Sequence, residues 1–391
     1  MNVFTQKAAI IITCHKRMVT YLEKEVTALG FTVQDSFVTG VRLTGSVNDC
    51  IKLNLHLRCA SQVLYCLQQF MANDATVIYQ HLQSYPWEKI LDSKGYFSVT
   101  SNVQNDTINN GLFANLRVKD AIIDRLRNTT GNRPNTGAAL TGAVIHLHWK
   151  NDEAAIFIDT SGDSIAKHGY RKIPGLAPML EGLAAATIYA TNWDKKSAFV
   201  NPMCGSGTLA IEAALMATNR VPGLYRSNYA FMHILGYEPI VYEKEMKSIE
   251  QQIIESKATI IASDISAKAI DNAKKNAAAA GVEHLITFQI CDFEKTTIPP
   301  QEAGVMMVNP EYGERLGEEA ELAITYARIG DFMKQQCGGY FGYVFTANLE
   351  LAKKIGLKAK RRIEFYNSIL DCRLLEYELY SGSKRNVQEQ Q

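Results

Sequence analysis

The second half of the chain contains four short apolar runs, and each of them ends on a polar side chain. The first run ends at Val200, and the others cover residues 258–263, 285–291 and 304–308. Such runs, separated by helical patterns, predict the buried strands of a parallel sheet. Ligands bind these sheets outside the carboxyl ends of the strands. We therefore expect the polar residues that follow the four runs to converge on one pocket: Asn201, Asp264, Asp292 and Asn309.

A tight glycine turn follows the first run and opens an alanine- and leucine-rich helix. Gly205 and Gly207 lack a Cβ, which permits positive φ and lets a ligand approach the backbone closely. The amide groups of this turn and of the first helical residues then point, unpaired, at that ligand. Further along, Ser266 is expected to cap a helix, and residues 362–368 and 370–380 predict an antiparallel strand pair at the sheet edge.

The first half of the chain predicts small α+β modules rather than a doubly wound sheet. The expected strands cover residues 8–14, 31–37, 41–47, 49–57 and 96–100, and the expected helices cover residues 18–29, 60–72 and 118–126. A hairpin is expected from residues 143–149 and 154–159, with its turn at Asn151 and Asp152.

Composition excludes several classes of protein. A chain of 391 residues predicts two or three domains, and a net charge of +1 leaves nucleic-acid binding to local patches. The eight cysteines show no Cys-x-x-Cys spacing, which argues against a zinc ribbon and favours reduced thiols in the cytoplasm; no metal ligand set is expected. The apolar run near the N-terminus is too short to span a membrane, so no membrane association is expected.

Two basic segments are candidates for RNA contact. One is a helix and its following loop, with Arg117, Lys119, Arg125, Arg127 and Arg133; a solvated helix face has the same composition. The other bridges the two halves and contains Lys167, His168, Tyr170 and Arg171; an ordinary interdomain linker has a similar composition. Arginine and tyrosine supply phosphate contact and base stacking, so both segments are candidate RNA-binding sites.

The glycine turn by itself fits several cofactors. The spacing Gly205-x-Gly207-x-x-Ala210 also matches the dinucleotide fingerprint, but that site needs an acid about 20 residues further on, and Asp264 lies 57 residues after Gly207. The Gly-Lys-Ser/Thr ending of an ATPase loop is missing. S-adenosylmethionine is the remaining common occupant, and it needs no lysine because it has no phosphates. Asp264 would accept hydrogen bonds from its ribose, and Asp292 would face its adenine amine.

At this point a family resemblance becomes specific. Asn309-Pro310-Glu311-Tyr312 resembles the Asn-Pro-Pro-Tyr motif of class I methyltransferases that modify exocyclic amines of nucleobases. Together with the strings 201–208, 309–317 and 159–171, it resembles the bacterial THUMP-domain methyltransferases that act on guanine N2 in 23S ribosomal RNA. Transfer RNA is the alternative substrate. A catalytically inactive RNA-binding or ribosome-assembly relative is the alternative from another class.

The resemblance implies an α/β fold in which a class I, Rossmann-like domain with a mostly parallel seven-stranded sheet follows an α+β ferredoxin-like and THUMP RNA-binding half. The halves are expected at residues 1–158 and 159–391, with an insertion at about 220–257. By the same resemblance, Asn309 and Pro310 position the target amine and Tyr312 stacks on the base. The implied cofactor contacts are Asn201, Pro202, Cys204, Gly205, Ser206, Gly207, Asp264, Ile265, Asp292, Phe293 and Asn309.

Two positions depart from the family pattern. The family usually has Asp where this chain has Asn201, and Pro where it has Glu311. Asn201 keeps a hydrogen-bonding side chain but loses a negative charge that would help to hold the cationic methionine end of the cofactor. Glu311 loses the fixed φ of proline. The residues expected to touch the amine and the base are retained.

Overall fold

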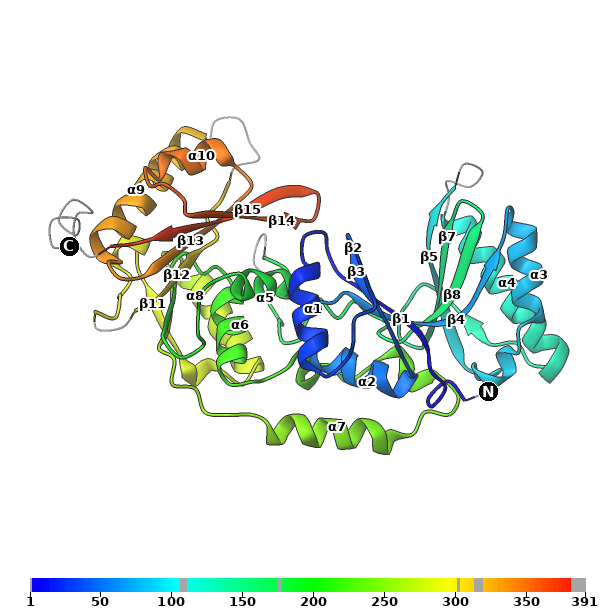
Figure 1. Ribbon diagram of the computed structural model, residues 1–391. Helices are drawn as coiled ribbons and strands as arrows, with labels where there is room; N and C mark the ends of the chain where they lie inside the picture. Colours follow the sequence, from blue (N-terminus) through cyan, green and yellow to red (C-terminus); the bar gives the residue numbers. More distant parts are fainter. Residues whose placement is uncertain (1, 106–110, 174–177, 301–302, 313–318, 381–391) are drawn as a thin grey trace. The chain divides into compact units, whose positions relative to one another are not determined.

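The computed structural model describes residues 2–105, 111–173, 178–300, 303–312 and 319–380 (Figure 1). The contacts divide the chain into two compact units. Unit 1 contains residues 1–15, 22–166 and 222–249, and unit 2 contains residues 16–21, 167–221 and 250–391. The insertion expected within the second half therefore packs for most of its length with unit 1, although it lies in sequence between two elements of unit 2.

Unit 1 is organised on one eight-stranded sheet of order β2-β3-β1-β4-β8-β7-β5-β6. Among the strands described in this sheet, β5 alone pairs in parallel, with β6 and β7. The strands are β1 (Ala8–Thr13), β2 (Asp35–Phe37), β3 (Gly40–Gly45), β4 (Gln62–Met71), β5 (Tyr96–Gln104), β6 (Asn135–Thr136), β7 (Ala143–Lys150) and β8 (Glu153–Asp159). The β7–β8 hairpin is confirmed, with Asn151 at φ 51° in its turn.

Two elements predicted in this half were wrong. Residues 49–57, expected as a strand, lie in the helix α2 (Val47–His56). The Ser46 hydroxyl accepts a hydrogen bond from the Asp49 amide, and the Asp49 carboxylate accepts one from the Ser46 amide, so a capping box starts the helix. Residues 60–72, expected as a helix, form the strand β4, which is central in the sheet. Its consecutive buried residues 63–66 hide the alternation by which a half-exposed strand is recognised.

The helices of unit 1 are α1 (Val19–Ala28, of which residues 22–28 belong to unit 1), α2, α3 (Ala75–Ser84), α4 (Gly111–Thr130) and most of α7 (Pro239–Gln251). Of these helices, α2 contacts β3 and β4, and α4 contacts β5 and α3. The inserted segment packs closely: a Cβ on Gly223 would lie 2.7 Å from the Leu55 carbonyl oxygen, and Ile234 forms a β-bridge with Leu91. The insertion therefore contributes to the core of unit 1.

Unit 2 contains a seven-stranded sheet of order β11-β10-β9-β12-β13-β15-β14. The first five strands are parallel, and β15 and β14 form the predicted antiparallel edge pair. The strands are β9 (Ala198–Asn201), β10 (Ile260–Asp264), β11 (Ile286–Ile290), β12 (Gly304–Val308), β13 (Phe341–Thr346), β14 (Arg361–Asn367) and β15 (Leu370–Glu378). The helices are α5 (Glu181–Tyr189), α6 (Thr208–Ala217), α8 (Ala267–Ala279), α9 (Glu319–Gln336) and α10 (Leu349–Lys354).

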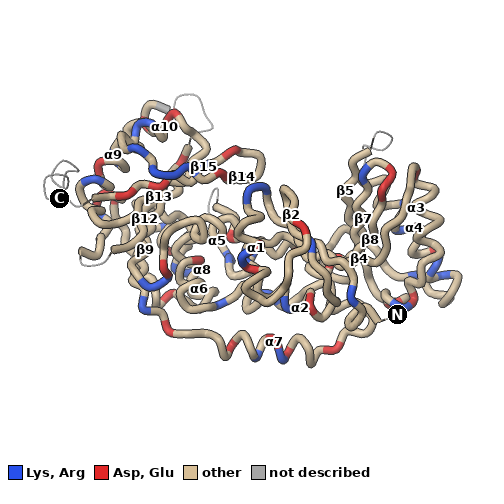
Figure 2. Tube along the Cα trace, in the orientation of Figure 1, with Lys and Arg blue, Asp and Glu red and all other residues tan. Residues whose placement is uncertain are grey.

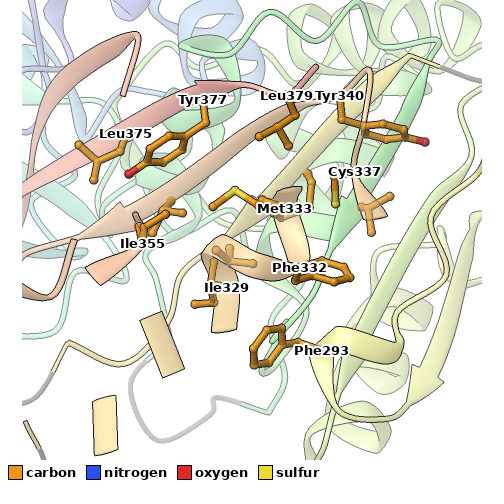
Figure 3. Close-up of a cluster of buried hydrophobic side chains, with 14 of the residues drawn as sticks. Phe293, Ile329, Phe332, Met333, Cys337, Tyr340, Ile355, Leu375, Tyr377 and Leu379 are labelled. Carbon is orange, nitrogen blue, oxygen red and sulfur yellow. The ribbon is translucent and has the colours of Figure 1, made fainter. Parts of the chain in front are cut away.

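A cluster of buried apolar side chains joins α9 and α10 to this sheet (Figure 3). Met306, Val344 and Leu375 come from three neighbouring strands, and Ile329 and Phe332 come from α9. Their burial fixes α9 against the strands that end at the candidate pocket. Basic and acidic positions are interspersed over the chain (Figure 2), in keeping with the small net charge. Among the described residues no helix is long and apolar enough to cross a membrane.

Candidate active site

The four polar residues at the predicted strand ends lie at one edge of the sheet of unit 2. Strands β11, β10, β9 and β12 are neighbours in that order and run parallel. Their carboxyl ends therefore lie side by side, and Asp292, Asp264, Asn201 and Asn309 follow or end them. The structure thus brings these four residues to the edge where parallel sheets bind ligands.

The turn after β9 has an unusual backbone. Met203, Gly205 and Gly207 have φ values of 55°, 54° and 83°, in the left-handed region. A Cβ on Gly205 would have no atom of the described residues within 4 Å, so among these residues open space faces the turn. A Cβ on Gly207 would lie 2.9 Å from the Ala273 Cβ, so this glycine allows α6 to pack closely on α8. One glycine therefore leaves room for a ligand and the other sets the helix position.

Asp264 holds this turn at the end of the neighbouring strand. One carboxylate oxygen accepts a hydrogen bond from the Gly205 amide at 2.9 Å, and the other accepts one from the Ser266 amide at 2.9 Å. Each carboxylate oxygen has a second lone pair, so both can still accept from a ligand hydroxyl. Ile265, the next residue, is 72% exposed. Asp264 thus presents acceptor oxygens beside an exposed apolar side chain.

Two buried amide oxygens at this edge have no hydrogen-bond partner among the described residues. Asn201 is buried; its Nδ2 donates to the Met307 carbonyl at 2.8 Å, but its Oδ1 is unpaired. The Oδ1 of Asn309, one strand further along the sheet, is also buried and unpaired. Leaving such an acceptor unsatisfied costs about 1–3 kcal/mol, so each is a candidate contact for a ligand donor.

Tyr312 is held from two sides. Its hydroxyl oxygen accepts a hydrogen bond from Asn367 Nδ2 at 3.0 Å, and Asn367 ends β14. Its carbonyl oxygen lies 3.5 Å from Asn348 Nδ2. Glu311 beside it is exposed. The rest of the motif string, residues 313–317, lies outside the described residues.

Asp292 is held by a residue that the sequence did not reveal. Arg328, on α9, donates from Nη2 to both carboxylate oxygens at 2.9 Å, and also to Glu294 at 2.6 Å. Its guanidinium lies 4.9 Å from the Phe293 ring centroid. Burial acts to raise the pKa of Asp292, but the bonds from Arg328 and the Glu294 amide outweigh it and hold that pKa below its usual range. Asp292 is therefore a fixed, ionised acceptor.

The other residues expected to contact the cofactor are buried or partly buried. Pro202 and Ser206 are buried, and Cys204 is partly buried with its amide bonded to the Ser263 carbonyl at 2.8 Å. Burial raises the pKa of the Cys204 thiol, which keeps it protonated. The Phe293 side chain is only 7% exposed and packs edge-on against Phe332. Its ring belongs to the core, which leaves its backbone as the candidate contact.

The expected RNA contact by His168 and Tyr170 was wrong, because both side chains are buried. His168 Nδ1 lies 2.7 Å from Glu212 Oε1 on α6, and neither side chain is exposed to solvent. Arg171 is likewise directed inward, and donates to the Met179 carbonyl and to the Thr208 hydroxyl. This segment therefore contacts the first residue of α6, Thr208, and its middle, Glu212. Lys167 alone among the four is exposed.

The basic helix has partners for most of its charges. Arg125 forms a bidentate pair with Glu88 at 2.7 and 3.0 Å, and Arg117 lies 4.8 Å over the Tyr79 ring. Lys119 is 3.8 Å from Asp120. Arg127 and the loop residue Arg133 are exposed. Contact between the five basic residues of this segment and RNA stays a prediction. Arg127 and Arg133 are the best candidates because they are exposed.

No group of three or more His, Cys, Asp or Glu side chains suited to a metal ion occurs within the described part of the chain. Arg328 and Asn367 were missed as site residues because each acts on a residue far away in sequence, 36 and 55 positions from Asp292 and Tyr312. Pairing across a fold leaves no local pattern, so no signal in a single sequence could have found them.

Family comparisons agree with this arrangement. Residues 168–376 match the RMKL-like methyltransferase domain, residues 9–64 match the RlmL ferredoxin-like domain and residues 72–159 match the THUMP domain. The fold and the site thus define a Rossmann-like methyltransferase domain preceded by ferredoxin-like and THUMP domains. The chain belongs to the RMKL-like methyltransferase domain family, whose model covers more than half of it.

Individual relatives support the same assignment. The chain is 35% identical over 377 residues to "Ribosomal RNA large subunit methyltransferase K/L" of Syntrophotalea carbinolica, a match over 94% of this chain and 53% of that protein. It thus spans about half the length of the curated relatives it matches. SMU.472, crystallised with SAH, has a TM-score of 0.86 at 25% identity over 97% of this chain and all of that one.

A third relative has a different name. A protein of Listeria monocytogenes str. 4b F2365, named as a predicted N6-adenine-specific DNA methylase, has a TM-score of 0.84 at 28% identity. The match covers 97% of each chain. The printed names therefore differ in the nucleic acid, ribosomal RNA in one relative and DNA in the other.

Proposed function

We propose that this chain transfers a methyl group from S-adenosylmethionine to the exocyclic N2 amine of a guanine in large-subunit ribosomal RNA. The observation that carries the proposal is the buried Oδ1 of Asn309 at the carboxyl end of β12, which has no hydrogen-bond partner among the residues that the structure describes. A buried acceptor without a partner fits an N–H donor that arrives with the substrate. An exocyclic amine has such N–H groups.

The residues at the strand ends fit the cofactor. Open space faces Gly205, Asp264 has acceptor capacity for ribose hydroxyls, and the exposed Ile265 offers an apolar surface to adenine. Asp292 Oδ2 accepts one bond from Arg328 and has a second lone pair for the adenine amine. The unpaired Oδ1 of Asn201 retains a negative dipole near the turn, although this residue lacks the charge of the family's aspartate.

The chemistry requires mainly positioning. S-adenosylmethionine, when bound, supplies a methyl group already activated on a sulfonium sulfur. Asn309 Oδ1 and the Pro310 carbonyl then accept hydrogen bonds from the two amine N–H groups, which directs the nitrogen lone pair toward the methyl group. The N–C bond forms as the S–C bond breaks, SAH is the leaving group, and one amine proton is released to water. Tyr312 stacks on the base, which must first leave its helix. Correct orientation of two reactants is worth about 7–11 kcal/mol of the barrier.

Ribosomal RNA is the favoured substrate because the relatives that match 94% of the chain have that name. The THUMP and ferredoxin-like matches support RNA in general and do not distinguish ribosomal from transfer RNA. The experiment therefore has to test two parts of the proposal separately: the RNA that is methylated and the atom that receives the methyl group.

The test uses total RNA from cells that lack this gene. Purified protein and S-adenosylmethionine with a labelled methyl group are incubated with this RNA, which is then separated by size and digested to nucleosides. We expect label in large-subunit RNA, as N2-methylguanosine. Label in transfer RNA would retain the mechanism and overturn the substrate, and label in N6-methyladenosine would overturn the base. No label, with SAH binding intact, would favour a binding protein.

Arg328 provides a second test, directed at the adenine site. Replacing Arg328 by methionine removes the donors that fix Asp292, so we expect SAH to bind roughly tenfold more weakly, the loss of about one charge-assisted hydrogen bond. S-inosylhomocysteine lacks the adenine amine, and its affinity is expected to change less than about twofold. Isothermal titration of both ligands measures the difference.

The Arg328→Lys variant is the matched control, because it keeps the charge but cannot bridge Asp292 and Glu294 in the same way. Its affinity for SAH should lie between those of the wild type and Arg328→Met. Equal losses for SAH and S-inosylhomocysteine would mean that Arg328 supports the fold of unit 2 rather than the adenine contact.

A further inference from the structure

The β14–β15 hairpin of unit 2 carries features that the proposed reaction leaves unexplained. Asn367 and Leu370 pair across a two-residue turn, in which Ser368 has a φ of 57°. The second turn residue is Ile369, and it is 89% exposed. Exposed turns ordinarily carry polar residues and glycine. A short turn thus projects an isoleucine that the fold does not bury.

The hairpin tip is tied to the candidate active site. Asn367, two residues before Ile369, donates the hydrogen bond to the Tyr312 hydroxyl at 3.0 Å. A nucleic-acid strand whose base reached Tyr312 would therefore pass close to the hairpin tip. The tip thus lies where nucleotides next to the target base would run.

Two basic side chains from the N-terminal region, Lys16 and Arg17, lie against the same hairpin. Residues 16–21 group with unit 2, and Tyr21 stacks on Phe365 with 5.7 Å between ring centroids. Lys16 Nζ lies 5.5 Å from the centre of the Tyr366 ring, and Arg17 Nη2 lies 2.8 Å from Glu364. A short piece of the N-terminal region therefore supplies positive charge to a hairpin some 350 residues away in sequence.

The charged side chains near the hairpin tip leave a small positive excess. Glu364 and Asp371 are the acids on this hairpin near the tip, and Arg373 pairs with both. With Lys16 and Arg17 included, three cations face two carboxylates, which gives a small positive excess. Such an excess suits one or two phosphate contacts. A single exposed apolar side chain among charges is too little for a stable protein interface, which buries about 800 Å² per partner.

We propose that Lys16, Arg17, Tyr366, Asn367 and Ile369 form an RNA-contact surface, called the hairpin surface here. Lys16 and Arg17 bind phosphates next to the target nucleotide, and Ile369 packs against the base beside it. Apolar side chains placed between bases hold an unstacked step open. This inference rests on the proposed function and adds a contact on the catalytic unit to those expected from the THUMP half.

The test measures binding of a radiolabelled in vitro transcript of 23S ribosomal RNA to the full chain on filters, at 50 and 200 mM KCl. Lys16→Glu should bind roughly tenfold more weakly at the lower salt, with a salt slope smaller by about one. Ile369→Ala should bind roughly fivefold more weakly at both salts, since a base contact carries no charge. Lys275→Glu, at an exposed position on α8, is the matched control and should bind as the wild type does.

Methyl transfer by the wild type to the same transcript is measured in parallel, with SAH affinity as the check that unit 2 is intact in each variant. If Lys16→Glu and Ile369→Ala bind the transcript as Lys275→Glu does, the hairpin surface is overturned, whatever the transfer result. If both bind more weakly but the wild type transfers no methyl group, the proposed reaction fails and the surface stands.

Discussion

Replacing Asn309 by alanine is expected to lower the rate constant of methyl transfer roughly 10³-fold, or about 4 kcal/mol in the barrier. The buried Oδ1 of Asn309 is without a partner among the described residues, and under the proposed mechanism the target amine becomes its partner. Alanine removes this acceptor, so the amine loses the contact that directs its lone pair. Single-turnover transfer to undermethylated 23S ribosomal RNA measures the loss.

The affinity for SAH separates the two possible roles of Asn309. If its side chain acts on the amine alone, the Kd of SAH should stay within about twofold of the wild type in the Asn309→Ala variant. Asn309→Asp is the matched control: its carboxylate accepts the same hydrogen bonds, so it should retain most of the activity. A Kd of SAH that rises in proportion to the lost rate would overturn the assignment to the amine.

The sequence could predict those site residues that a short, local sequence pattern marks. Asn201, Asp264, Asp292 and Asn309 each come directly after an apolar run, and the geometry of a parallel sheet brings their strand ends to one edge. Those are local patterns combined with a general rule. The contact between Arg328 and Asp292 depends on how α9 packs on the sheet, which no short window of sequence contains.

The fold was predicted less well where burial hides periodicity. Strand β4 lies between β1 and β8, and its run of buried residues, 63–66, could belong to a strand or a helix. In α2 the Ser46–Asp49 capping box was visible in the sequence, but an apparent alternation obscured it. The grouping of residues 222–249 with unit 1 could not be predicted, because it depends on tertiary contacts alone.

The segment 168–171 shows how composition can mislead about function. Its histidine, tyrosine and arginine resemble an RNA-contact set, yet His168 and Tyr170 are buried and Arg171 bonds to the first residue of α6. Burial of charged and polar groups costs free energy unless they are paired, and here the pairing is provided by α6. The segment therefore anchors the first residue and the middle of α6, the helix that begins directly after Gly207.

The largest expected effect on stability concerns this same pairing. Glu212→Ala should lower the free energy of unfolding of unit 2 by about 1–3 kcal/mol, because it removes the buried carboxylate oxygen that lies 2.7 Å from His168 Nδ1. Because the chain has two units, the effect is measured best by hydrogen exchange of the α6 amides, which reports on unit 2 directly.

Lys275→Ala is the matched control for the loss of an ion pair, since its partner Asp271 is as exposed as Lys275 itself, and the change should stay below about 1 kcal/mol. The double variant His168→Leu/Glu212→Leu should recover most of the stability, because two apolar side chains need no pairing. A loss for Glu212→Ala no larger than that for Lys275→Ala would show that the pair does not hold α6. Since α6 begins directly after Gly207, a loosened helix should also weaken SAH binding, and the double variant should restore it.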